Sequence, residues 1–419
     1  PKMEERYKLL GITDPFEPQA FPVRLWDVFG QAGHPVRATI EGMGSLLLAR
    51  LLDLNETQTG ILAIVFKLAK EKNWPLIDLK DLQSLLKEVY DHASEYSAQY
   101  GNISKQSVGA IQRSLLVLEQ EGADQFFGEP ALDLQDFMQL DSSGRGYINI
   151  LSATRLFNSP KLYSTFLIWM LSRLFETLPE VGDLEKPKFV FFFDEAHLLF
   201  NDASKLFLEK VEQVVRLIRS KGVGIYFITQ NPQDLPESVL AQLGNRVQHA
   251  LRAYTPKEMK AIKVAAQSFR PNPEFDTETV LTELGTGEAL VSFLNEKGQP
   301  SVVERSYILS PQSSFDLLNE SEQLALITSS PFHQKYAVRV DNESAYEKLT
   351  EKSAREEKEK EREEEDKARV AEEKASQKRS PGRPRKSSLE KAKDSFISSL
   401  FRTIAREVAK LIMGSFKRK

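Results

Sequence analysis

The sequence lacks cysteine, contains little histidine and has no long run of apolar residues. Its 419 residues include no cysteine and five histidines. The absence of cysteine excludes disulfide bonds and thiolate zinc sites, and the scattered histidines show no metal-ligand spacing. The most apolar stretch, 166–171, is too short to cross a bilayer. We therefore expect a protein of the reducing cytoplasm.

The chain also lacks a recognisable signal peptide and begins with Pro1 rather than Met. Such a start is typical of a fragment or of a processed chain. The net charge of −4 argues against a globally basic surface that coats nucleic acid, although it leaves room for a local basic patch. Hydrophobic residues make up 41% of the chain, so a substantial core can form in two or three domains, or in one large domain with insertions.

The first 144 residues divide into a short extended part and a helical part. Residues 1–40 contain two extended runs, 21–28 and 35–40, which we expect to join a sheet completed elsewhere. Residues 41–144 read as a helical insertion, with apolar positions at helical spacing over 56–72, 78–95 and 104–121. Asp78 and Ser104 are the expected N-caps of the last two helices.

From 145 to 310 short apolar runs alternate with helical segments. Expected strands at 146–151, 188–193, 224–229 and 246–252 are separated by expected helices, among them 160–177 and 203–221. This alternation predicts an α/β fold with right-handed crossovers and a mostly parallel sheet. The apolar run 189–193 predicts a central strand buried on both faces. Residues 286–309 predict a closing antiparallel pair that turns at 295–298.

After residue 310 the composition becomes progressively less typical of a globular domain. We expect a linker over 311–350, and a solvated, charged single helix over 351–376, where glutamates precede lysines and arginines by four residues. A basic Pro/Gly linker over 377–389 and an amphipathic helix over 390–419 complete a tail that we expect to be partly disordered.

Two adjacent acids, Asp194 and Glu195, end the apolar run 189–193. ATP hydrolysis needs one carboxylate near Mg²⁺ and a second one that orients or deprotonates the attacking water. Asp194 fits the first role and Glu195 the second, which is a Walker-B pattern. The alternative is a pair of acids that caps the next helix. His197, two residues further on, is expected to start that helix beside the site.

The next expected strand ends at Gln230, whose side chain has both a donor and an acceptor. In an open α/β sheet, ligands bind at the carboxyl ends of the strands. By its position and its two kinds of hydrogen-bonding group, Gln230 fits contact with a phosphate bound at this edge. Alternatively, Gln230 is a turn residue that caps the loop before Pro232.

The run from Asp194 through 219–222 and 228–232 to 243–246 resembles the HerA–FtsK superfamily of P-loop ATPases. Within it, the chain is most similar to the bacterial HerA-like proteins of the YjgR-like group, and the resemblance covers roughly 10–310. It implies a RecA-like P-loop ATPase core formed by 1–40 and 145–310, with ATP and Mg²⁺ as cofactors. It further implies a homo-hexameric motor on double-stranded DNA, in which Asp194 assists Mg²⁺, Glu195 is the catalytic base and Gln230 the sensor.

The same resemblance implies a role for an arginine after the next helix. Arg246 matches the family's candidate finger, which reaches the nucleotide of a neighbouring subunit and stabilises charge in the transition state. Arg252 is a second, weaker match for this role. A structural salt bridge is the alternative for Arg246.

The sequence departs from the family in one respect. A phosphate-binding loop of the form Gly-x-x-x-x-Gly-Lys-Ser/Thr is absent from the 419 residues. In the family this loop precedes the position at which the present sequence begins, so truncation is the simpler expectation and natural loss is the alternative. Either way, we expect these 419 residues alone to bind ATP poorly.

The tail offers two further candidate interactions. Arg383, Arg385 and Lys386 lie in a Gly-Arg-Pro context that resembles an AT-hook, which inserts into the minor groove of A·T-rich DNA, although a flexible linker has the same composition. The helix expected at 390–419 has one apolar and one basic side. It suits a protein partner, an anionic membrane, or the chain's own surface.

Three functional hypotheses therefore remain from the sequence. The first is an ATP-driven motor on double-stranded DNA. The second is a non-catalytic module, derived from such an ATPase, that binds DNA or a partner. The third is an ATPase that acts on something other than DNA, such as a membrane assembly.

Overall fold

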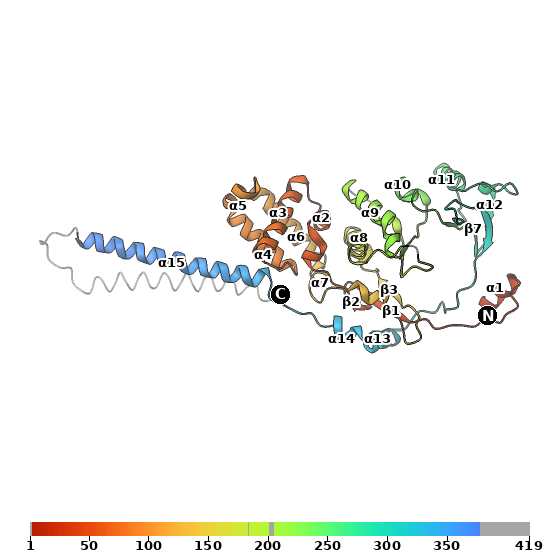
Figure 1. Ribbon diagram of the computed structural model, residues 1–419, viewed down its shortest axis with the longest axis horizontal. Coiled ribbons are helices and arrows are strands. Elements are labelled where there is room, and N and C mark those ends of the chain that lie inside the picture. The colour runs from red at the N-terminus through yellow and green to blue at the C-terminus, as the bar shows by residue number, and fades with distance from the viewer. Residues whose placement is uncertain (1, 183, 201–204, 378–419) are drawn as a thin grey trace. The chain divides into compact units, whose positions relative to one another are not determined.

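The computed structural model describes residues 2–182, 184–200 and 205–377. The chain divides into two units, 1–351 and 352–419. The labelled helices and strands are drawn in Figure 1. The predicted α/β class is confirmed, and most of the strand pairing is parallel.

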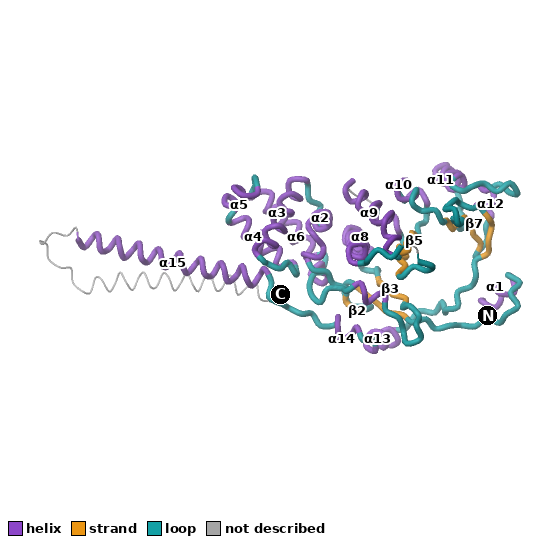
Figure 2. Tube along the Cα trace, in the orientation of Figure 1, coloured by secondary structure: helices purple, strands orange, loops and turns teal. Residues whose placement is uncertain are grey.

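The predicted helical insertion is a cluster of helices without strands (Figure 2). It comprises α2 (Ile40–Leu51), α3 (Glu56–Lys72), α4 (Leu79–Asp91), α5 (Ala93–Tyr100), α6 (Lys105–Gln120) and α7 (Ala123–Phe126). The predicted caps are present: Asp78 accepts hydrogen bonds from Lys80 N and Asp81 N, and Ser104 accepts one from Ser107 N. The apolar sides of α3, α4 and α6 are buried against one another.

Three separate sheets follow from the strand pairing. In the first, β1 (Val23–Asp27) lies between β2 (His34–Pro35) and β3 (Ile148–Ser152), both parallel to it. In the second, β4 (Phe189–Phe193) pairs in parallel with β5 (Val223–Phe227). The third is antiparallel and contains β6 (Arg246–Gln248), β7 (Glu288–Ser292) and β8 (Glu304–Tyr307). The predicted closing pair is thus β7 and β8, and Gly298 N donates to Asn295 O in the predicted turn.

The prediction that 189–193 is buried on both faces is wrong at one position. Phe191 and Phe193 are buried, but Phe192 points to the opposite face and is 63% exposed. Its ring stacks on that of Tyr226, which is 56% exposed, at a centroid distance of 4.7 Å. The reason is that β4 pairs only with β5 among the described residues, and its apolar packing lies on the Phe191 side.

The helices that flank the second sheet lie on its buried side or follow its strands. They are α8 (Pro160–Thr177), the short helix η3 (Ala196–Leu199), α9 (Lys205–Leu217), η4 (Ile218–Lys221), η5 (Pro232–Asp234) and α10 (Glu237–Leu240). Buried residues of α8 and η3 join the main hydrophobic core together with Phe191 and Phe193. A second, smaller core contains Ile262 and Phe269 beside Leu281 and Leu290, and it connects α11 (Pro256–Gln267), α12 (Thr277–Glu283) and β7.

The expected linker over 311–350 is instead a folded strap. It contains α13 (Glu320–Ser329) and α14 (Phe332–Tyr336), and the last helix, α15 (Ala345–Gln377), begins within it. Tyr336 is fully buried, and its hydroxyl donates to Asp136 Oδ2 over 2.5 Å. Arg37 Nη1 donates to Tyr336 O, and Lys335 Nζ lies 2.7 Å from Asp136 Oδ2. The expectation failed because a few long-range contacts, rather than local composition, hold this segment.

Two segments at the ends of the described chain complete the fold. The N-terminal helix α1 (Lys2–Leu9) is joined to the third sheet by Arg6, which donates to Ile308 O and lies over the Tyr307 ring. At the other end, α15 extends over the predicted charged segment, and nearly every side chain from 353 to 371 is exposed. No helix in the described part of the chain is long and apolar enough to cross a membrane.

Candidate functional site

The carboxyl ends of β4 and β5 meet at one edge of the second sheet. The register pairs Phe193 with Phe227, and beyond it Ile228 N donates to Phe193 O and Ala196 N to Ile228 O. The continued pairing fixes the two segments that leave the strands. Asp194, Glu195 and Gln230 therefore lie at the same edge, as the parallel pairing predicted.

Glu195 is the centre of the contacts at this edge. Its Oε1 accepts a hydrogen bond from Gln230 Nε2 over 3.0 Å, and its Oε2 lies 3.2 Å from His197 Nδ1. Both Glu195 Oε2 and His197 Nδ1 are buried from solvent and have no other polar partner in the described structure. The carboxylate is thus held between an amide donor and an imidazole nitrogen.

The backbone of Glu195 has an unusual conformation. Its φ of 47° and ψ of 49° place it in the left-handed region, where it precedes η3. A non-glycine residue seldom adopts this conformation, which costs of the order of 1 kcal/mol and is enriched at functional sites. The sharp turn directs the chain from β4 into η3 at the position where the carboxylate meets Gln230.

Asp194 differs from its neighbour in exposure. It is exposed, and its Oδ1 accepts a hydrogen bond from the backbone N–H of Glu195. Its backbone carbonyl accepts one from the hydroxyl of Tyr163 on α8, over 2.9 Å. Burial, with a smaller contribution from the charges of Asp194 and Glu195, raises the pKa of Tyr163 to about 12. The phenol therefore stays protonated and fixes the end of β4.

The loop after β5 is fixed by its own hydrogen bonds. Thr229 Oγ1 donates to Asp234 Oδ2 over 3.1 Å, and Asn231 Oδ1 accepts from Gln233 N at the start of η5. Gln230 itself is exposed in this loop, with its side chain turned to Glu195. The turn-residue alternative for Gln230 therefore leaves its side-chain contact unexplained.

The two arginines are placed elsewhere. Arg246 Nη1 donates to Ser268 O, just after α11, over 2.7 Å. Arg252 donates to the carbonyls of Thr282 and Leu284. In the described structure no contact joins either arginine to Glu195, and neither forms a salt bridge, so both bind backbone carbonyls instead. Arg383, Arg385 and Lys386, together with the helix expected at 390–419, lie outside the described residues.

The side chains at the strand edge would supply only some of the ligands of a magnesium ion bound to a nucleotide. Mg²⁺ is bound by one or two carboxylates together with waters and substrate phosphates, rather than by an all-protein cage. The exposed carboxylate of Asp194 fits this pattern, and no group of three or more metal-ligating side chains gathers in the described part of the chain. The remaining ligands would have to come from the nucleotide and from water.

The sequence did not point to one residue of this edge, Tyr163, or to one contact, that of His197 with Glu195. Tyr163 gave no signal, because a tyrosine in an apolar helix reads as core and its contact with Asp194 depends on tertiary packing. His197 was expected only to start a helix. It lies in η3 and also contacts Glu195, which the two-residue spacing could have suggested.

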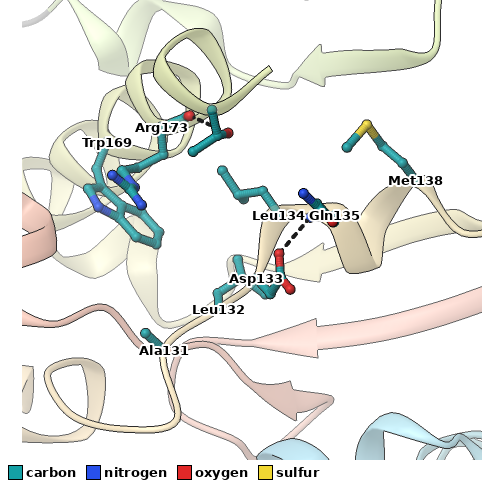
Figure 3. A pocket seen from close by; sticks show the side chains of 9 residues that line it. Ala131, Leu132, Asp133, Leu134, Gln135, Met138, Trp169 and Arg173 are labelled. Atoms are coloured by element: carbon teal, nitrogen blue, oxygen red, sulfur yellow. Dashed lines mark hydrogen bonds between the residues drawn. The ribbon is translucent and has the colours of Figure 1, made fainter. Parts of the chain in front are cut away.

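A cavity of about 250 Å³ lies away from this edge, between the 131–138 segment and α8 (Figure 3). Its lining includes Leu134, Met138, Trp169 and Arg173. Asp133 Oδ1 accepts a hydrogen bond from Gln135 N at its rim. None of the predicted site residues lines this cavity, so it does not belong to the strand edge.

Comparison with solved structures finds distant likenesses. The bacterial conjugative coupling protein TrwBdeltaN70, in complex with sulphate, shares 10% identity with a TM-score of 0.48, over 70% of this chain and 76% of that one. VirB4 of Thermoanaerobacter pseudethanolicus shares 16% identity with a TM-score of 0.44, over 80% and 81%. The genome packaging NTPase B204 from Sulfolobus turreted icosahedral virus 2, in complex with AMPPCP, shares 17% identity with a TM-score of 0.27, over 44% and 75%. These likenesses are too distant to transfer a function.

Comparison with protein families is more decisive. A search of functionally curated proteins finds no match. The family model described as "Helicase HerA-like C-terminal" matches residues 1–419. This match covers the whole chain, including the helical insertion and both strands of the candidate site. The chain therefore belongs to the HerA-like helicase C-terminal family.

Proposed function

We propose that this chain carries the hydrolytic half of a HerA-like, RecA-like ATPase that drives movement along double-stranded DNA. The observation that carries the proposal is the hydrogen bond between Glu195 and Gln230, which joins the tips of two neighbouring parallel strands. A carboxylate and an amide in this arrangement suit the activation of water and the sensing of a phosphate.

Each residue of the edge has a distinct proposed task. Glu195 accepts a proton from the attacking water or orients it, and its contact with His197 limits where the carboxylate can turn. When nucleotide is present, Gln230 gives up its hydrogen bond to Glu195 and turns to the γ-phosphate. Its amide N–H can donate to a carboxylate oxygen or to a phosphate oxygen. Asp194 would hold Mg²⁺ through its exposed carboxylate, and the ion would neutralise charge on the phosphates.

The residues at the strand edge do not include a phosphate-binding loop. The sequence contains no Gly-x-x-x-x-Gly-Lys-Ser/Thr run whose backbone amides would hold the phosphates. The second candidate function is a non-catalytic module that binds DNA or a protein partner. The hydrogen bond between Glu195 and Gln230 favours the first candidate, because a module without hydrolysis has no need of it.

DNA as the substrate, a homo-hexameric assembly and a cytoplasmic setting are proposals that follow from the family. In such an assembly Arg246 would act on the nucleotide of a neighbouring subunit. It would first have to leave the carbonyl of Ser268, to which it donates within its own chain.

The test is ATP hydrolysis by the protein purified from its native source, with and without duplex DNA. The proposal expects hydrolysis that DNA stimulates and that Glu195→Gln abolishes. Hydrolysis that DNA does not stimulate would favour another substrate for the motor. The absence of hydrolysis in the native protein would favour the binding module.

A further inference from the structure

We propose that the exposed side of α11 binds the phosphate backbone of duplex DNA. Lys257, Lys260 and Lys263 lie at three-residue spacing along this helix, and all three are exposed. We call these residues the lysine stripe. Three-residue spacing keeps side chains on one side of a helix, here the side opposite the buried Ile262 and Ala265.

The lysine stripe is free of neutralising acids. The helix contains one acid, Glu258, and its Oε2 accepts hydrogen bonds from Tyr254 N and Thr255 N in a capping box. Within the described part of the chain, no ion pair involves any of the three lysines. By contrast Lys67, Lys80 and Lys87 of the helical insertion each lie within 4 Å of a carboxylate. The stripe therefore keeps its positive charge for an external partner.

The density of charge on the stripe suits DNA. Three lysines span about 9 Å of helix, at a rise of about 1.5 Å per residue. Duplex DNA carries one phosphate charge per about 1.7 Å of its axis, so about five charges on the two strands lie along a segment of this length. Tyr254, 88% exposed, lies two residues before the helix, and Met259 and Val264 are exposed on it. A flat ring and short apolar groups beside lysines suit contact with sugars and base edges.

The position of α11 connects the stripe to the proposed hydrolytic edge. The helix contacts η5, which begins two residues after Gln230. The carbonyl of Ser268, which follows the helix, binds Arg246. A partner that displaces α11 therefore acts on the loop that carries the sensor and on the candidate finger. This inference rests on the proposed action on DNA and specifies the surface that contacts it.

The test is binding of a fluorescent 30-base-pair duplex to the 419-residue chain without nucleotide, as a function of KCl concentration. The stripe variant is Lys257→Gln, Lys260→Gln and Lys263→Gln combined. The matched control is Lys67→Gln, Lys80→Gln and Lys87→Gln, which changes the charge equally. Both are also made together with Arg383→Ala, Arg385→Ala and Lys386→Ala, so that the tail does not mask the result.

We expect the stripe variant to bind at least about ten-fold more weakly, with a salt slope smaller by about 3, and the control to bind like the wild type. Tyr254→Ala should weaken binding at an unchanged slope, while Tyr254→Phe should not. If the wild type binds DNA and the stripe variant matches the control, the stripe proposal fails and the proposed function stands. A wild type that does not bind DNA overturns the stripe proposal, while the hydrolysis test on the native protein decides the proposed function. If the stripe substitutions weaken binding to phosphatidylglycerol vesicles but not to DNA, the surface binds membranes and the proposal is overturned.

Discussion

Glu195 accepts a hydrogen bond from Gln230 over 3.0 Å, although the two residues lie 35 positions apart in the sequence. The contact depends on the parallel register of β4 and β5, which brings both strand tips to one edge. Gln230→Ala should leave Oε1 of Glu195 without its donor while the strand pairing persists. We expect ATP hydrolysis by the native protein to fall by roughly ten- to a hundred-fold, a loss typical of a positioning contact near the chemistry. An unchanged rate in a steady-state phosphate-release assay would exclude Gln230 from the reaction.

The 419-residue chain by itself should bind ATP weakly. Affinity for a triphosphate depends on a cradle of backbone amides and a lysine, and the sequence contains no such run. We expect a dissociation constant of about 1 mM or weaker, equivalent to about −4 kcal/mol. Isothermal titration calorimetry with Mg·ATP measures it. Stoichiometric micromolar binding would show that the present residues hold the phosphates themselves.

Tyr336 should be a major anchor of the strap. Its buried hydroxyl donates to Asp136 and accepts from Asp133 N. Tyr336→Phe removes both hydrogen bonds and leaves the Asp136 carboxylate, which is largely buried, with one donor fewer. We expect a loss of about 1–3 kcal/mol in the free energy of unfolding, measured by urea denaturation.

The control for this change is Tyr346→Phe. Tyr346 is 43% exposed, and its hydroxyl forms no hydrogen bond within the described structure. Its substitution should change the unfolding free energy by less than about 0.5 kcal/mol. Equal effects of the two substitutions would mean that the hydroxyl of Tyr336 does not hold the strap.

Stability should fall as the pH drops below 6.5 because of His34. Burial, together with the nearby charges of His333 and Arg24, lowers the pKa of His34 from 6.5 to about 4. The unfolded chain takes up a proton near pH 6.5, whereas the folded chain does so only near pH 4. Between pH 4 and pH 6.5, His34 therefore takes up a proton when the chain unfolds. Lowering the pH through this range decreases the free energy of unfolding by up to roughly 3 kcal/mol.

The variant His34→Phe isolates this effect, because it keeps a ring beside Trp26 and Phe332 and removes the titrating group. Its unfolding free energy should depend less on pH between 6.5 and 4 than that of the wild type. Parallel pH profiles of the two proteins would show that His34 titrates alike in both states.

α15 should be a stiff single helix. It carries ion pairs such as Glu363 with Lys367 and Asp366 with Arg369, and it has few apolar positions for a partner helix. Because the chain has no cysteine, spin labels at Lys352→Cys and Ala371→Cys are unique. Pulsed electron paramagnetic resonance should give one narrow distance distribution. It should correspond to about 28 Å between the backbones of the two labelled residues, from a rise of about 1.5 Å per residue. A broad distribution would indicate disorder, and added distances that grow with protein concentration would indicate a coiled coil.

The sequence predicted those features that depend on local chemistry. The caps at Asp78 and Ser104 need only a side chain and the next turn of backbone. The meeting of Glu195 with Gln230 follows from the parallel order of the strands. Features that depend on distant partners were missed. The burial of Tyr336 is set by Asp136 and Arg37, 200 and 299 positions away. The capping box of α13, Asn319 with Glu322, was a readable sign that this segment is not a linker.

The exposure of Phe192 is a second feature that depends on tertiary packing and that the sequence did not predict. An apolar run of five residues predicts burial on both faces, yet burial depends on what covers each face. In the described structure the Phe191 side is covered by the main core, and Phe192 and Tyr226 stack on each other in solvent. Period and composition cannot tell these two outcomes apart.

The most direct test of the account is the rate of DNA-stimulated ATP hydrolysis by the native protein and its Glu195→Gln variant. The control variant is Glu274→Gln, an exposed carboxylate that accepts no hydrogen bond in the described structure. The account predicts that Glu195→Gln loses roughly 10²–10⁴-fold in rate, as expected for a lost general base. It also predicts unchanged stability for this variant and an unchanged rate for the control. Equal rates for wild type and Glu195→Gln would contradict the account.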